Sequence, residues 1–222
     1  MYVFFKLAMA NILSNMTVPL TGLFSVAFLG HLKDIEHLTA VTLTLTIFDS
    51  IFYGFSFLRM GTTGLTAQAT GQEDEEMQQL ILLRNGLMAL TLGFGLLIFQ
   101  IPLEDLGFHF LHTTPEVEAI GRHYFEIRIL AIPASFLNSV AIGWLLGRGM
   151  SNTVLGVTAV GNLTKIGLDY VFIVHLGWAS VGAGWSVVTS QYLTVVLSLI
   201  LSFWEFSIGE IPVLVAKIID RQ

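Results

Sequence analysis

The sequence contains no cysteine and only a small proportion of charged residues. The absence of cysteine excludes disulfide bonds and thiolate metal sites, although it does not indicate a cellular compartment. Charged residues make up 12% of the 222 positions, whereas a soluble domain usually carries about 25%. This deficit is too large for a water-soluble surface of this size. The formal net charge of −6 at pH 7 also argues against a nucleic-acid partner.

The patterns of an enzyme active site are also missing. There is no nucleophile motif and no glycine-rich phosphate-binding loop. The six histidines fall at span ends or in loops and make no i, i+4 pair with a carboxylate on one face, which argues against a metal site. We therefore expect neither an enzyme nor a bound cofactor.

The sequence is instead rich in long apolar stretches. Hydrophobic residues form 54% of the chain and the mean hydropathy is +0.76. A bilayer-spanning helix needs about 20 mostly apolar residues, and six stretches qualify: 3–30, 38–66, 80–102, 120–146, 153–175 and 180–204. The sequence thus predicts an all-α, polytopic membrane protein with six transmembrane helices in one domain, residues 1–204. Residues 205–222 are expected to form a short cytoplasmic or interfacial tail.

The basic residues near the span ends predict the orientation. Residues on the side of the N-terminus are Lys6, Arg59, Arg84, Arg148, Lys217 and Arg221, and those on the other side are Lys33, Arg122 and Arg128. Because cytoplasmic ends carry the excess of Lys and Arg, both termini are expected in the cytoplasm. Arg59 and Arg148 are expected to extend their side chains to the cytoplasmic interface. Residues 104–123 are expected to form a polar loop on the opposite side.

Polar residues gather on one face of three predicted helices. At 100° per residue, each set occupies an arc of about 160° or less: Asn11, Ser14, Asn15, Thr17, Thr21, Gly22 and Ser25; Thr39, Thr42, Thr46, Asp49, Ser50, Tyr53 and Ser56; and Thr158, Asn162, Lys165 and Asp169. For the serines and threonines alone, the simpler interpretation is hydrogen bonding and close packing between helices. The same interpretation suits the small-residue stretch 61–71.

Packing between helices does not explain the three charged residues in these faces. A charge at the centre of a spanning helix costs about 2.5–3.5 kcal/mol, and such residues usually face a bundle interior or a watery cavity. Lys165 and Asp169 are four residues apart, which places them one above the other on a helix. They are either a structural ion pair or part of a transport site. Asp49 is either a cavity residue or a structural hydrogen-bond acceptor.

Three separated motifs resemble the multidrug and toxic compound extrusion (MATE) transporters, and in particular the branch of DNA-damage-inducible protein F. They are "LSNMTVPLTGLFSVAFLGHL", "FLRMGTTGLTAQATGQEDEE" and "GNLTKIGLDYVFIVHLGWASVGAGWSVVTSQY", and they occur in the family's order. The resemblance implies a secondary exporter of drugs and metabolites, coupled to protons or sodium ions, in the cell (inner) membrane. It also implies that these six helices form one lobe of a twelve-helix, two-lobe protein.

The chain departs from the family's pattern at two positions in this region. Ser25 stands where the branch usually has an aspartate, and Lys165 replaces the asparagine that lies four residues before the family's helix-5 aspartate, here Asp169. The resemblance implies that Asp169 faces the cavity where the cation or proton is coupled. Asn138 aligns with a cavity asparagine. The candidate cavity residues are Ser25, Asp49, Tyr53, Asn138, Asn162, Lys165 and Asp169.

The leading functional hypothesis is a lobe of an antiporter that exports small organic molecules. It would work in the lipid bilayer with a second six-helix lobe or with a second copy of the chain. The alternative is a truncated or split subunit, or a scaffold, that does not transport.

Overall fold

The computed structural model describes residues 22–31, 35–111 and 113–204. Most of the predicted span 3–30 and the whole predicted tail 205–222 lie outside these residues. The described chain is helical from residue 22 to residue 30 and then forms α2 (Ile35–Gly54), α3 (Phe57–Gly71), α4 (Glu75–Ile98), α5 (Gln100–Phe110), α6 (Pro115–Arg128), α7 (Ile132–Gly147), α8 (Ser151–Asp169) and α9 (Ala179–Trp204). A 3-10 turn, Ile129–Ala131, links α6 to α7, and a π-helical segment, Tyr170–His175, follows α8.

Five helical runs in the described residues are long and apolar enough to cross a membrane. They are Ile35–Gly71, Glu75–Ile98, Pro115–Gly147, Ser151–His175 and Ala179–Ser202. The predicted spans 38–66, 80–102, 120–146, 153–175 and 180–204 each coincide with one of these runs. The predicted fold class, an all-helical polytopic membrane protein, is confirmed.

The predicted ends of several helices are wrong because polarity marks the limit of an apolar span and not the limit of a helix. The predicted span 80–102 begins at residue 80, but α4 already begins at Glu75, where Asp74 caps it by accepting a hydrogen bond from the Met77 N–H at 2.9 Å. Acidic residues in a first helical turn are favourable. Polar residues can therefore extend a helix beyond its apolar part.

The predicted loop 104–123 is also wrong, since it contains most of α5 and the first part of α6. Thr114 caps α6, and Pro115 occupies its first turn, where a missing N–H has no cost. Arg122 then joins α6 to α5 through Glu104 Oε1 at 3.2 Å and Asp105 Oδ1 at 2.7 Å. These contacts hold the short helix against the end of the bundle.

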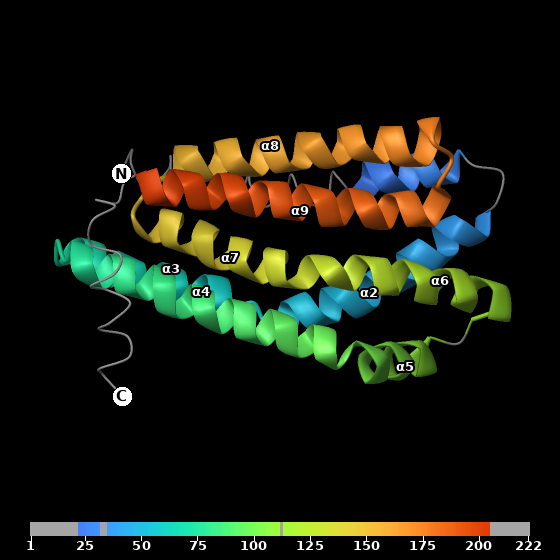
Figure 1. Ribbon diagram of the computed structural model, residues 1–222, viewed down its shortest axis with the longest axis horizontal. Helices are drawn as coiled ribbons and strands as arrows, with labels where there is room; N and C mark the ends of the chain where they lie inside the picture. Colours follow the sequence, from blue (N-terminus) through green and yellow to red (C-terminus); the bar gives the residue numbers. More distant parts are fainter. Residues whose placement is uncertain (1–21, 32–34, 112, 205–222) are drawn as a thin grey trace.

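The helices run along the long axis of the molecule, with α7 between the α8–α9 pair and the α3–α4 pair (Figure 1). The α3–α7 contact is very close: a Cβ added at Gly143 would lie 2.7 Å from the Arg59 carbonyl oxygen, and one added at Gly147 would lie 2.5 Å from Thr66 Cβ. The predicted close packing of stretch 61–71 is therefore present, but the small residues that allow it are the glycines of α7.

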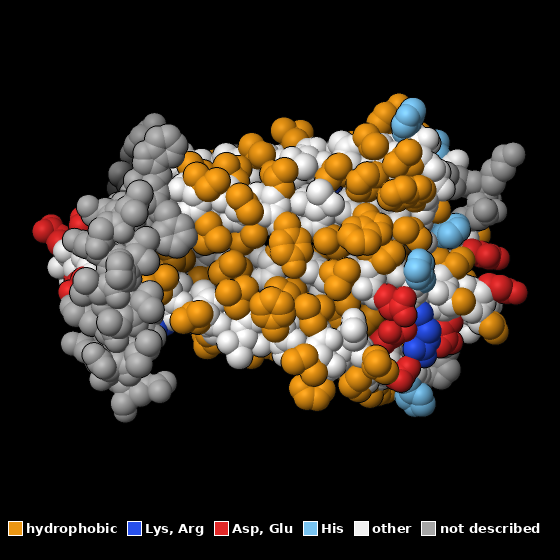
Figure 2. Space-filling model, in the orientation of Figure 1, with side chains coloured by type: hydrophobic (Ala, Val, Ile, Leu, Met, Phe, Trp, Pro, Cys, Tyr) orange, Lys and Arg blue, Asp and Glu red, His pale blue; other side chains and the backbone are white. Residues whose placement is uncertain are grey.

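Charged side chains on the visible face lie toward the two ends of the molecule, and hydrophobic side chains cover the region between them (Figure 2). The interior is also largely apolar. Its main cluster is built on large aromatic and aliphatic residues, among them Phe48, Phe108, Phe125, Phe136 and Trp144. Such a distribution is that of a protein whose flanks contact lipid.

Candidate functional site

A buried cluster of polar and charged side chains joins three helical segments. Asp169, the last residue of α8, is fully buried. Lys165 precedes it by one turn, and its Nζ lies 2.7 Å from Asp169 Oδ2. Ser25, from the helical segment 22–30, and Ser186, from α9, complete the cluster. The i, i+4 spacing on α8 therefore brings the two opposite charges into direct contact.

Three donors converge on the Asp169 carboxylate. Ser25 Oγ donates to Oδ2 at 2.6 Å and itself accepts a hydrogen bond from Lys165 Nζ. Ser186 Oγ donates to the other oxygen, Oδ1. A buried charge is tolerated when it is both paired and hydrogen-bonded, and Asp169 meets both conditions. With Lys165 as an ammonium and Asp169 as a carboxylate, the cluster has no net charge.

The two charged partners differ in accessibility. The Lys165 side chain keeps 16% of its surface exposed, whereas the Asp169 side chain exposes none. Lys165 is therefore the member of the pair that a solute could approach. Displacing it from Oδ2 would leave an oxygen site of one carboxylate and two hydroxyls, which are ligands suited to a proton or a small hard cation.

The two candidate asparagines lie in other contacts. Asn138 Oδ1 accepts a hydrogen bond from Ser198 Oγ at 2.9 Å, between α7 and α9. Asn162 is on the same face of α8 as Lys165, and its Nδ2 is buried without a hydrogen-bond partner among the described residues. Neither amide hydrogen-bonds to the Lys165–Asp169 pair in that part of the chain. Asn162 thus offers an unused donor about two turns from Asp169.

Asp49 and Tyr53 lie apart from this cluster, on the outer face of α2. Asp49 is exposed and Tyr53 is 80% exposed. Among the described residues no side chain or backbone group donates a hydrogen bond to Asp49, so the interpretation of Asp49 as a structural acceptor finds no support there. The hydroxyls on this face instead bond to carbonyls of their own helix: Thr39, Thr42, Thr46, Ser50 and Ser56.

Sequence reasoning did not single out Ser186 or Arg128. Ser186 is one of many hydroxyl residues spread around α9, and only the packing of α9 on α8 brings it to Asp169. Arg128 served only as a marker of orientation, yet its guanidinium lies 4.8 Å from the centre of the Phe48 ring and donates to Tyr124 Oη at 2.7 Å. No local pattern in the sequence identifies the contact of Ser186 with Asp169 or that of Arg128 with Phe48, although Tyr124 lies one turn before Arg128 on α6.

Comparison with known proteins identifies the family to which the chain belongs. The MatE family model matches residues 10–171. DNA damage-inducible protein F of Escherichia coli is 36% identical over 195 residues, which cover 88% of this chain and 42% of that protein. Multidrug and toxin extrusion protein 1 of Mus musculus is 27% identical over 197 residues, which cover 87% of this chain and 34% of that protein.

The fold agrees with these sequence matches. The structure of a MOP superfamily transporter from Pyrococcus furiosus superposes with a TM-score of 0.80 at 25% identity, covering 92% of this chain and 44% of that one. The chain thus spans less than half the length of these relatives. With the family model matched over most of its length, the chain belongs to the MatE family and resembles one lobe of a DNA damage-inducible protein F-like member.

Proposed function

We propose that the chain is one lobe of a secondary active antiporter that exports small organic molecules, and that Asp169 is its coupling residue. The observation that carries this proposal is the fully buried carboxylate, held by Lys165, Ser25 and Ser186, inside a lobe of this family. The membership in a family of transporters and the absence of an active-site motif both support a protein that is not an enzyme.

The coupling chemistry follows from the competition for Asp169 Oδ2. Lys165 Nζ occupies this oxygen at 2.7 Å. An imported proton or sodium ion would have to take the place of the ammonium, because two cations on one buried carboxylate oxygen repel each other. Coupling in this lobe therefore requires Lys165 to move away when the ion binds. Lys165→Asn should remove this competitor and make efflux depend more strongly on the ion gradient.

A second lobe is part of the proposal because of the outer face of α2. Asp49 on this face is exposed and would cost about 2.5–3.5 kcal/mol if it faced lipid at the centre of the bilayer. Packing against a second six-helix lobe, or against a second copy of the chain, would place this face beside a cavity between the lobes. We infer an inner-membrane location with both termini in the cytoplasm, from the distribution of Lys and Arg.

The test is efflux from vesicles that hold the purified chain alone, or the chain together with a co-expressed second lobe. We expect efflux driven by an imposed proton or sodium gradient when the partner is present, and a loss of at least tenfold in Asp169→Asn. Asn152→Ala, at an exposed position at the start of the same helix, is the matched control. Efflux that is unaffected by Asp169→Asn would refute the assignment of the coupling residue. A complete absence of transport in all preparations would favour the alternative, a subunit or scaffold that does not transport.

A further inference from the structure

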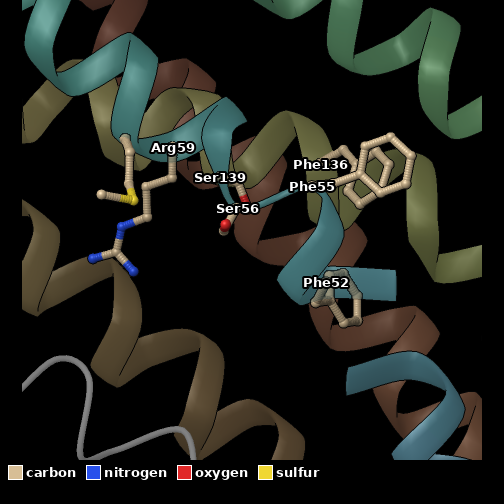
Figure 3. Close-up of a pocket in the computed structure, with 7 residues that line it drawn as sticks. Phe52, Phe55, Ser56, Arg59, Phe136 and Ser139 are labelled. Carbon is tan, nitrogen blue, oxygen red and sulfur yellow. The ribbon is translucent and has the colours of Figure 1, made fainter. Parts of the chain in front are cut away.

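A cavity of about 220 Å³ opens where α2 ends and α3 begins, and α7 forms its other wall (Figure 3). The lining includes three phenylalanines, two serines and one arginine: Phe52, Phe55, Phe136, Ser56, Ser139 and Arg59. Within the described part of the chain, no carboxylate belongs to the lining. The cavity is separate from the Asp169 cluster, with which it shares no residue.

The cavity exists because two features of the packing meet there. Gly143 and Gly147 let α7 approach α3 closely. Ser139 and Phe136 lie about one and two turns before Gly143 on nearly the same face of α7, but they face the turn at Phe55 and Ser56, where the helical run is interrupted. The larger side chains of Phe136 and Ser139 separate the two walls beyond the glycine contact.

One end of the cavity is aromatic. The Phe136 ring lies 4.9 Å from the Phe55 ring and 6.1 Å from the Phe52 ring, measured between centroids. These separations fall in the range of favourable aromatic pairs. The rings of two helical runs thus form a continuous wall on which the flat face of another ring can pack.

The other end of the cavity is cationic. In Figure 3 the Arg59 guanidinium points away from the aromatic rings, with the Ser56 and Ser139 hydroxyls between the two. Ser56 Oγ donates to the Tyr53 carbonyl at 2.8 Å and Ser139 Oγ to the Ser135 carbonyl at 2.9 Å. Their protons are used on their own backbones, so they present acceptors to the cavity, whereas Arg59 presents only donors.

Arg59 belongs to the helical run Ile35–Gly71, whose 37 residues are more than the bilayer requires. It is 12 residues from the end of α3 at Gly71, which corresponds to about 18 Å along the helix axis. Because a guanidinium has five N–H donors, it can bind a ligand carboxylate while it keeps other hydrogen bonds.

We propose that this cavity binds a small aromatic organic acid, with its ring against the phenylalanines and its carboxylate on Arg59. The carboxylate matches the guanidinium in charge and in its two-pronged geometry. The volume is below the roughly 300–1,000 Å³ of sites for drug-sized ligands, so the ligand has a single ring. An amine would gain cation–π attraction from the rings but would be repelled by Arg59. As a substrate site, the cavity rests on the proposed function; as a binding site, it does not.

The experiment measures binding to the full chain in nanodiscs of neutral phosphatidylcholine. The probe is radiolabelled 3-phenylpropanoate, and the competitors are the matched neutral 3-phenylpropanamide and the matched cation 3-phenylpropylamine. We expect saturable binding of the acid, with the amide and the amine at least tenfold weaker. Arg59→Met keeps an unbranched apolar stem and removes the charge, and it should weaken acid binding at least tenfold. Arg148→Met is the matched control and should change it less than twofold, because Arg148 stacks on Trp144 outside the cavity.

Three results would overturn the proposal: no saturable binding of the acid, competition by the amine equal to that of the acid, or unchanged acid binding in Arg59→Met. If Arg59→Met does not fold, Arg59→Lys decides, because it keeps the charge; the preference for acid over amide should persist, and its loss would overturn the proposal. Efflux of other compounds without acid binding would refute this site alone. Acid binding without any efflux would refute the proposed transport function alone.

Discussion

Breaking the Lys165–Asp169 pair should destabilise the lobe far more than breaking an exposed pair of the same spacing. The Asp169 carboxylate accepts hydrogen bonds from Lys165, Ser25 and Ser186 and is fully buried. An asparagine at position 169 offers one acceptor oxygen in place of two, and its NH₂ would face one or more of the same donors. Lys165 would also lose its counter-charge. Removing one partner of a buried ion pair typically costs about 3–5 kcal/mol.

The double variant Lys165→Asn with Asp169→Asn should cost less than Asp169→Asn alone, because no uncompensated charge remains. We therefore expect a double-mutant interaction energy of at least about 2 kcal/mol. The measurement is equilibrium unfolding in mixed micelles with increasing sodium dodecyl sulfate, for the wild type, the two single variants and the double variant. The matched control is Glu118 with Arg122, which is also an i, i+4 pair but keeps 37% and 34% of its side chains exposed. Glu118→Gln should cost no more than about 1 kcal/mol.

Additive effects of the two substitutions on α8 would refute the reasoning, because they would mean that Lys165 and Asp169 contribute independently. A cost for Asp169→Asn equal to that of Glu118→Gln would refute it as well. That result would mean that water reaches the pair and screens it.

Three further predictions concern packing, topology and pH. Gly143→Ala should destabilise the lobe by about 1–3 kcal/mol in the same unfolding measurement, because its Cβ would lie 2.7 Å from the Arg59 carbonyl oxygen. The control is Gly156→Ala, which should be neutral or stabilising because no heavy atom of the described residues lies within 4 Å of the added Cβ. Cysteines introduced at Glu75 and Glu116 should react with an impermeant maleimide from opposite sides of intact cells, and labelling from one side would contradict the predicted topology. Burial raises the pKa of Glu104, against the opposing effect of Arg122, so the folded state holds this proton more tightly than the unfolded state. The stability due to Glu104 is therefore complete below its unfolded pKa and declines as the pH rises through the folded pKa. Over that range Glu104→Gln should become more stable relative to the wild type. A difference in unfolding free energy between the two proteins that does not change with pH would contradict this.

The sequence predicts the helices of this lobe better than their ends. Apolar runs identify the spans because lipid requires them, and the i, i+4 spacing of Lys165 and Asp169 on α8 is enough to predict that they lie on one face. The limits of α4 and α6 depend on the caps at Asp74 and Thr114, which act outside the apolar runs.

Contacts between helices were the part that sequence patterns could not provide. Ser186 reaches Asp169 only because α9 packs on α8, and hydroxyl residues are too common on α9 for one to be distinguished. The cavity at Arg59 likewise depends on Phe136 and Ser139, which are more than 70 positions away in the chain. Arg59 was expected to extend toward the interface, and its place in the cavity wall was not foreseen.

The close contact of α3 with α7 restricts how this lobe can move. At Gly143 and Gly147 the α7 backbone lies directly against the Arg59 carbonyl oxygen and the Thr62 and Thr66 side chains of α3, so we expect steric clashes to oppose sliding of one helix along the other. We therefore expect the pair to move as one body, and the interruption at Phe55 and Ser56 to be the hinge about which α2 rotates. Phe52 lies on the α2 side of this hinge and Arg59 on the other, so any rotation changes the distance between the ring wall and the guanidinium. A ligand that spans this distance would lock the hinge at one angle.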